Sequence, residues 1–210
     1  MKPSSPLITS ILLLLIALGC CNNSYGQSNS IMSKFYFPGA IGLSQPIGNT
    51  KLDLDMQAGL MINTALEFRP IEGNALFYRF NYDAITNHYK EVYLNSPTNV
   101  NSGKLSSSIF SLGVGYRHKA GAIKLFGLLQ PGIGINSYDR VNFNTGAITV
   151  DQVSRRHLSL KLSAGAEYYL AEHFALTIEP SYFYLAPRGN YRLLNPQSIN
   201  LSIGFTTTLF

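Results

Sequence analysis

Three side chains in this sequence are of the types that hydrolytic chemistry needs: His157, Ser159 and Glu167. A histidine can take the proton of a serine hydroxyl when an acidic group orients the histidine, and the serine then acts as a nucleophile. Residues separated by an even number of positions share one face of a strand, so these three would point the same way. The other histidines are too dispersed to predict a metal site. They are His88, His118 and His173.

A second set of reactive groups consists of charged residues that recur inside otherwise apolar segments. In extended strands these charges would share one face. Charges that are buried must be paired with opposite charges, so the set predicts an internal polar network. Its members are Glu67, Arg79, Arg117, Lys124, Lys161, Glu167 and Glu179.

The segments that carry these residues are predicted to be strands, and the longest runs from Leu52 to Phe68. Its even positions are apolar apart from Thr64, and its odd positions hold most of its polar residues. This period of two indicates a strand with one apolar face and one polar face.

Seven further segments repeat the pattern, which gives eight strands in all. Longer connections alternate with short ones, as in a meander that crosses a membrane with short periplasmic turns and longer outer loops. The predicted strands cover 35–43, 52–68, 76–83, 110–117, 123–130, 158–170, 174–184 and 199–210. The longer connections cover 45–51, 85–103, 136–153 and 186–196.

The composition indicates which face meets which surroundings. The chain is 46% hydrophobic and only 13% charged, whereas about a quarter is usual in soluble proteins. The eight apolar faces contain no charged residue, and a basic residue at mid-bilayer would cost roughly 2–4 kcal/mol. Strands cross lipid only as a closed barrel, because their backbone groups must all be paired. The sequence therefore predicts an all-β fold, an eight-stranded antiparallel up-and-down transmembrane barrel.

The basic excess does not predict nucleic-acid binding. The formal charge is +5, but the lysines and arginines are scattered without a basic run. A soluble barrel would pack its apolar face inward and expose charge, and this chain has too few charges for that arrangement.

The first 26 residues are predicted to be an export signal. Lys2 precedes an apolar stretch over 7–18 and a short polar stretch, and cleavage is expected after Gly26. The alternative is lipoprotein processing at Cys20 or Cys21. Residues 27–34 would then form a short N-terminal segment, and residues 35–210 the barrel.

The chain resembles the small bacterial outer-membrane barrels typified by the OmpA transmembrane domain and OmpX. The likeness covers 35–210 and rests on the eight alternating segments, on the stretch GAEYYL at 165–170 leading to LTIEP at 176–180, and on Phe210. It implies the outer membrane of a Gram-negative bacterium, contact with outer-membrane lipid and lipopolysaccharide, and recognition of Phe210 by the barrel-assembly machinery. Phe210 is out of phase with the outward set Ile203, Phe205 and Leu209, so this signal is less regular than in typical members.

Such barrels host several functions. One hypothesis is a structural, adhesive or envelope-machinery role, in secretion or conjugation, with a protein partner at the outer loops. The second is a narrow solute pore gated by the internal ion pairs. His157, Ser159 and Glu167 also resemble the groups of outer-membrane lipid A deacylases, but those enzymes turn their triad toward lipid. We therefore expect no enzyme, and no catalytic, cofactor or metal site. The loop residues expected to contact a partner are Tyr89, Tyr93, Asn95, Tyr138, Arg140, Tyr191 and Arg192.

Overall fold

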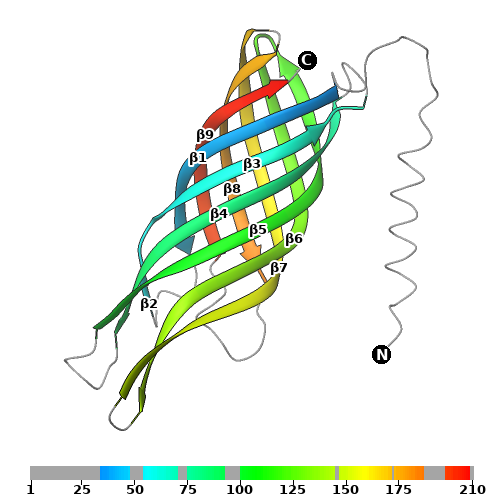
Figure 1. Cartoon of the computed structure of the whole chain (residues 1–210). Coiled ribbons are helices and arrows are strands. Elements are labelled where there is room, and N and C mark those ends of the chain that lie inside the picture. The colour runs from blue at the N-terminus through cyan, green and yellow to red at the C-terminus, as the bar shows by residue number, and fades with distance from the viewer. Residues whose placement is uncertain are drawn as a thin grey trace, which may run out of the picture. The chain divides into compact units, whose positions relative to one another are not determined.

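A computed structural model describes residues 34–47, 54–70, 75–92, 100–144, 147–171, 173–186 and 197–208 (Figure 1). The predicted export signal, Cys20, Cys21 and Phe210 lie outside these residues, and so do most of the loop residues expected to contact a partner. Among the described residues, no helix is long and apolar enough to cross a membrane.

Nine strands form one antiparallel sheet that closes on itself. Strand β4 pairs with both β3 and β5, and β1 pairs with β9, so the sheet has no free side around the barrel wall. Strands β2 and β3 both pair with β4 and occupy a single position in the wall. This confirms the predicted eight-stranded up-and-down barrel. The strands are β1 (Phe35–Ile47), β2 (Leu54–Met56), β3 (Gly59–Phe68), β4 (Leu76–Val92), β5 (Val100–Ala120), β6 (Ile123–Asn144), β7 (Ala147–Ala171), β8 (Phe174–Leu185) and β9 (Gln197–Thr208).

The apolar faces of the strands point outward. Leu112 on β5 is 61% exposed and Leu162 on β7 is 55% exposed, whereas their chain neighbours Ser111 and Lys161 are buried inside the barrel. A surface of exposed large hydrophobic residues without charge suits hydrocarbon rather than water. The predicted assignment of inside and outside is therefore confirmed.

The strand predicted over 52–68 is interrupted after Met56. Met56 lies opposite Tyr89, and Leu60 lies opposite Thr86. Three residues lie between Met56 and Leu60, but only two lie between their partners Thr86 and Tyr89. Strands β2 and β3 therefore meet at a one-residue bulge. The bulge reverses the alternation, and Met56 is buried inside although its even number predicted an outward position.

The side chain of Asn87 satisfies the backbone at this bulge. Its amide nitrogen donates to the carbonyl oxygens of Gln57 at 3.2 Å and Ser44 at 3.3 Å. A side chain at Gly59 would collide with the Asn87 amide and with the Thr86 carbonyl. The bulge thus depends on an inward asparagine and a neighbouring glycine, which a count of apolar residues does not reveal.

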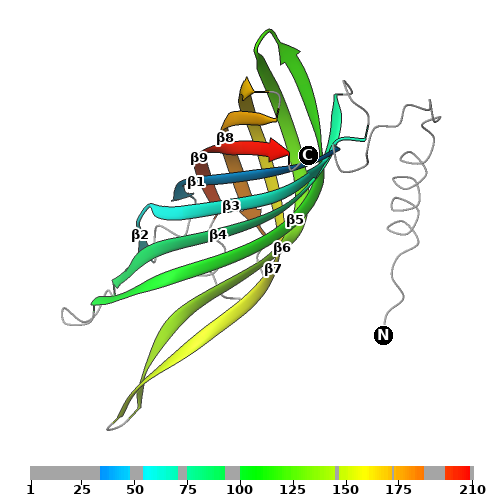
Figure 2. The same ribbon diagram turned by 45° about the horizontal axis from the view of Figure 1, so that its top comes forward.

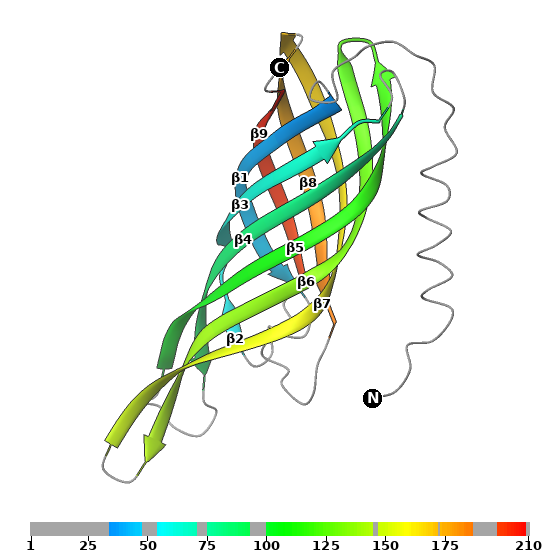
Figure 3. The same ribbon diagram turned by 45° about the vertical axis from the view of Figure 1, so that its right-hand side comes forward.

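The described residues of two predicted loops belong to extensions of strands. Strands β4 and β5 pair as far as Val92 and Val100, inside the predicted loop 85–103. Strands β6 and β7 pair continuously to Asn144 and Ala147, inside the predicted loop 136–153. In Figures 1 and 3 the outer end of the β6–β7 hairpin projects beyond the other strands. The inner part of these extensions still lines the interior, where Ile85, Tyr89 and Asn136 are buried.

The remaining long connections differ less from the prediction. Strand β1 continues to Ile47, within the predicted turn 45–51. Strand β8 ends at Leu185 and β9 begins at Gln197, and residues 187–196 between them lie outside the described residues. Tyr89, predicted in a loop, lies on β4 and is buried against Leu105, with Tyr138 packed beside them.

Side chains fill the barrel in successive layers, which follow the inward residues of β4. An apolar layer at the short-turn end is followed by charged and amide groups, by a second apolar layer, and by a third at the outer end. The three apolar layers consist of Phe77, Phe126 and Leu128; Met61, Ile85, Ile109, Phe183 and Leu185; and Met56, Tyr89 and Leu105.

Phe126 and Leu128 break the predicted alternation of β6 because they belong to the first apolar layer. The rings of Phe77 and Phe126 meet edge to face, with centroids 6.2 Å apart. Gly115 lies directly opposite Phe77 on β5, and a Cβ atom there would overlap the Phe77 ring. The layer fits in so narrow a barrel only because the residue facing it has no side chain.

We predict that Gly115→Ala lowers the free energy of unfolding by about 1–3 kcal/mol, because the added methyl group displaces the Phe77 ring. Gly127→Ala is the matched control, since nothing lies within 4 Å of its added Cβ, and it should change stability by less than about 0.5 kcal/mol. Urea unfolding in phospholipid vesicles measures both. Equal stability of the two variants would contradict the packing of this layer.

Candidate functional site

The centre of the barrel holds a charge-neutral network of ion pairs. Four carboxylates and four basic groups form it, and every member bonds at least one group of opposite charge. Four negative charges against four positive charges sum to zero, which is what a buried set of ions requires. The members are Glu67, Asp83, Glu167 and Glu179, with Arg69, Arg79, Arg117 and Lys161.

Glu67, at the end of β3, is bonded by three arginines. Its Oε2 accepts from Nε of Arg79 at 2.8 Å, and its Oε1 accepts from Nη2 of Arg117 at 2.8 Å and from Nε of Arg69 at 2.5 Å. The carboxylate itself is fully buried. Hydrogen bonds between ionised groups are stronger than neutral ones, so Glu67 joins β3, β4 and β5 through the interior.

Arg117 and Arg69 connect Glu67 to the opposite wall. Arg117 Nη2 also donates to Glu167 Oε1 on β7 at 2.8 Å, and Arg69 Nη1 donates to the Tyr169 hydroxyl at 2.8 Å. Arg69 lies beyond the end of β3, with its guanidinium carbon 3.4 Å from the centroid of the Tyr36 ring. It closes the short-turn end of the network.

The Arg69 guanidinium stays charged. Burial by itself lowers its pKa, but the carboxylates of Glu67 and Glu167 outweigh that effect and raise the pKa above its ordinary value. No pH that the folded protein meets therefore removes this cation from the network.

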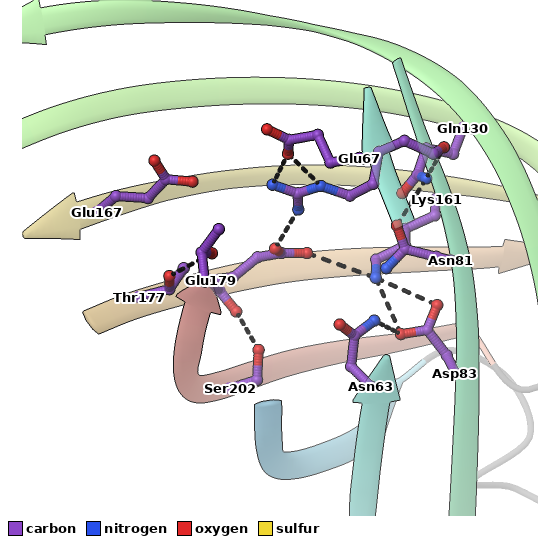
Figure 4. A network of polar contacts seen from close by, with 12 residues as sticks. Asn63, Glu67, Asn81, Asp83, Gln130, Lys161, Glu167, Thr177, Glu179 and Ser202 are labelled. Atoms are coloured by element: carbon purple, nitrogen blue, oxygen red, sulfur yellow. Dashed lines mark hydrogen bonds and ion pairs between the residues drawn. The ribbon is translucent and has the colours of Figure 1, made fainter. Parts of the chain in front are cut away.

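The second half of the network lies closer to the outer end. Arg79 Nη1 donates to Glu179 Oε2 at 2.9 Å, and Lys161 Nζ lies 3.4 Å from the other oxygen of Glu179 (Figure 4). Lys161 also donates to both oxygens of Asp83, at 2.9 and 3.2 Å, and Asn63 donates to Asp83 at 2.5 Å. Strands β3, β4, β7 and β8 are thereby joined across the interior.

Neutral groups and rings complete the surroundings of these ions. Gln130 on β6 donates to the Asn81 side chain at 2.8 Å and to the Arg79 carbonyl at 3.0 Å. The guanidinium carbon of Arg117 lies 4.3 Å from the centroid of the Phe77 ring, and that of Arg79 lies 4.8 Å from the Phe126 ring. The first apolar layer thus lies against the arginines through cation–π contacts.

Six of the seven residues predicted for the polar network lie in it, and Lys124 does not. Its Nζ lies 3.9 Å from the centroid of the Tyr169 ring, and no described carboxylate lies within ion-pair distance of it. Two members were missed, Asp83 and Arg69. The alternation of β4 places Asp83 on the same face as Arg79, which was the available signal. Arg69 follows the end of a strand, so no periodicity could assign it to the interior.

His157, Ser159 and Glu167 do not form a hydrolytic triad. His157 and Ser159 face the interior near the outer end of the barrel, where His157 Nδ1 lies 3.2 Å from the Ala186 carbonyl oxygen. Glu167 lies eight residues further along β7, about 26 Å away at the usual rise of a strand, and its oxygens bond Arg117 and Tyr169. Within the described ranges, no group of three or more metal-ligating side chains is placed to hold a metal ion.

Comparisons with known proteins agree with this geometry. The profile of a family described as outer membrane protein beta-barrel domain matches residues 12–206. No curated protein sequence matches the chain.

Solved structures with the same fold come from several bacteria. Neisserial surface protein A is 17% identical, with 83% of this chain and 97% of that chain covered and a TM-score of 0.52. OprG from Pseudomonas aeruginosa is 11% identical, with 82% and 94% covered and a TM-score of 0.55. A major outer membrane protein from Thermus thermophilus is 13% identical, with 82% and 98% covered and a TM-score of 0.53. At these identities the likeness concerns the fold.

We predict that Glu67→Gln lowers the free energy of unfolding by about 3–5 kcal/mol, because it leaves buried arginines without their shared carboxylate. Lys119→Gln, at an exposed position of β5, is the control and should cost less than about 0.5 kcal/mol. The loss of the compact band of unboiled protein on gels, followed against urea concentration, measures both. Similar midpoints would show that the network does not stabilise the barrel.

We also predict that Lys161→Met and Asp83→Asn are strongly non-additive. Each single change strands a buried charge, whereas the double change removes both charges together. A double-mutant cycle should give a coupling free energy of about 0.5–3 kcal/mol. The cycle of Lys161→Met with the outward Leu112→Ala provides the additive reference, and additivity in both cycles would refute the pairing.

Proposed function

This chain belongs to the outer membrane protein beta-barrel domain family, and we propose that it acts as a closed scaffold whose outer hairpins contact a protein partner. Its family places it in the outer membrane of Gram-negative bacteria. We favour the scaffold role over a solute pore because side chains fill the interior of the barrel.

The proposal rests on the observation that the charged side chains inside the barrel are inaccessible to water. Glu67 and Glu167 are 0% exposed, and Arg79 and Lys161 are 1% exposed. A water-filled passage would leave such groups accessible, as in the wide channels of larger barrels. The apolar layer around Phe183 extends the same blockage toward the outer end, and the rings of Phe77 and Phe126 pack against Arg79 and Arg117 within the network.

The outer end offers the surface that a partner could use. We define the β6–β7 ribbon as residues 139–144 and 147–152, which pair with one another beyond the last contact of β6 with β5 at Tyr138. Figure 2 shows this ribbon standing clear of the neighbouring strands. Its backbones pair without a break from Asp139↔Gln152 to Asn144↔Ala147. A paired projection at the outer end of the barrel supports a contact role at the cell surface.

We predict that the wild-type protein shows no stepwise conductance in planar bilayers, because three apolar layers and the ion pairs block its axis. A pore gated by the ion pairs would behave differently. It would conduct in steps that change on Arg79→Ala or Glu179→Ala, and the outward Leu112→Ala control would leave those steps unaltered. Reproducible steps of that kind would replace the scaffold proposal with the pore.

We further predict that replacing residues 140–151 by Asn-Gly abolishes contact while preserving the barrel. The replacement closes the hairpin between Asp139 and Gln152 with a two-residue turn, and stability should change by less than about 1 kcal/mol. The matched control replaces Gly121 and Ala122, at the short turn of the opposite end, by Asn-Gly. Adhesion of cells that display each variant, to one another and to host surfaces, is the measurement. Unchanged adhesion by both variants would contradict a contact role for the ribbon.

A further inference from the structure

The short-turn end of the barrel carries more positive charge than the ion network uses. Lys119 lies two residues beyond Arg117 on the same face of β5, and Lys124 is the second residue of β6, on its interior face. Lys34 lies just before β1, where its carbonyl oxygen accepts a hydrogen bond from the backbone N–H of Arg69 at 2.9 Å. We define Lys34, Lys119 and Lys124 as the lysine cluster. It lies at the short-turn mouth of the interior.

Two members of the lysine cluster face each other directly. Lys119 and Lys124 are register partners on β5 and β6, and neighbouring strands lie only about 4.8 Å apart. Like charges at such positions destabilise a pair of strands. Lys119 is exposed and Lys124 is half-buried, so an anion from solution can approach both. An anion between the two amines would replace their repulsion with two attractions.

The acidic residues that the structure describes at this end do not balance the cluster. They are Glu67 and Glu167, which are buried and already bonded by Arg69 and Arg117. Two arginines and three lysines against two carboxylates leave an excess of three positive charges. The Lys124 amine is repelled by Arg69, Arg117 and Lys119 and attracted only by Glu167. The mouth therefore has a positive potential.

An aromatic ring holds the most buried amine of the cluster in place. Lys124 Nζ lies 3.9 Å from the centroid of the Tyr169 ring. The Tyr169 hydroxyl is itself fixed, because it accepts from Arg69 at 2.8 Å and donates to Glu167 at 3.0 Å. A cation–π contact orients an ammonium group without neutralising it. Lys124 thus keeps its charge and its hydrogen-bond donors for an external group.

The position of the cluster indicates where its ligand comes from and how large it is. Short turns lie on the periplasmic side of barrels of this type, and residues of the interior face point toward the barrel axis rather than toward lipid. Strands β1 and β6 are four steps apart in either direction around the wall. A small anion that bridges Lys119 and Lys124 would therefore leave Lys34 at the opposite wall. A ligand with several negative groups can bond both sides.

We propose that the lysine cluster binds an acidic segment of a periplasmic polypeptide, with one carboxylate between Lys119 and Lys124 and another at Lys34. Hydrogen bonds from ammonium groups to carboxylates are charge-assisted and stronger than neutral ones. Alternate side chains of an extended segment share one face at intervals of about 7 Å, so a few residues carry carboxylates across the mouth. This contact is separate from the one proposed for the outer hairpins.

The test is the binding of a fluorescein-labelled peptide of alternating glutamate and serine to the full chain in phosphatidylcholine nanodiscs. Fluorescence anisotropy is recorded at about 0.01 M salt, where the Debye length is about 30 Å. The cluster variant is Lys119→Gln with Lys124→Gln. The matched control, Lys104→Gln with Arg156→Gln, removes the same charge from exposed positions nearer the outer end. Retention of the compact band of unboiled protein verifies that each variant is folded.

We expect the cluster variant to bind the peptide about fivefold to tenfold more weakly than wild type, and the control to bind as wild type does. The same peptide with glutamine in place of glutamate should not bind. Equal binding by wild type and a folded cluster variant would overturn the proposal. Tighter binding of inorganic polyphosphate than of the acidic peptide would also overturn it, since the ligand would then be a phosphate polymer.

A third variant tests whether the chain supplies the anion itself. Glu72 and Glu172 belong to connections at residues that the structure does not describe, and the variant carries Glu72→Gln with Glu172→Gln. Binding of the peptide by wild type supports an external ligand. Binding by this variant alone would show that a carboxylate of the chain already occupies the cluster, and the proposal would fail.

Discussion

The structure depends on one constraint: hydrocarbon offers no partner to a charge or to a backbone amide. The backbone meets it by closing the sheet through β4, and the side chains meet it by turning every described ion of the membrane-spanning wall inward. Inside so narrow a barrel the ions cannot reach water either, and they must neutralise one another. Four carboxylates and four basic groups do so across the full width of the interior.

The need for neutrality also explains why single carboxylates of the network bond several basic groups. Glu67 serves three arginines, and Glu179 bridges Arg79 to Lys161. A shared carboxylate needs all its partners in place together, so each ion positions strands that are distant in the sequence. The apolar layer around Phe183 excludes solvent on the outer side of the ions, and the rings of Phe77 and Phe126 lie against Arg79 and Arg117, which strengthens the attraction within the network.

In the proposed scaffold role, the outer surface is the place for function. The same strands that bury ions in the wall carry hydroxyls and exposed cations further out, and beyond these the β6–β7 ribbon continues without any lipid to face. Along β7 one thus passes from Leu162 against hydrocarbon to Leu158, Arg156 and Ser154 at its border. The polarity of the outward side chains therefore matches their surroundings at each position along the barrel axis.

The sequence alone determined the fold class, the strand count and the inward position of Glu67, Arg79 and Lys161, because a wall between lipid and a polar interior imposes a period of two. It could not determine where strands end, since β4 to β7 continue past the residues whose sequence alternates between apolar and polar. Only the tertiary structure decided which ions meet: Glu67 and Glu167 are a hundred positions apart and share Arg117. It also decided the bulge at Gln57 and the exclusion of Lys124 from the network. Register and closure bring such residues together, and periodicity specifies a face but not a neighbour.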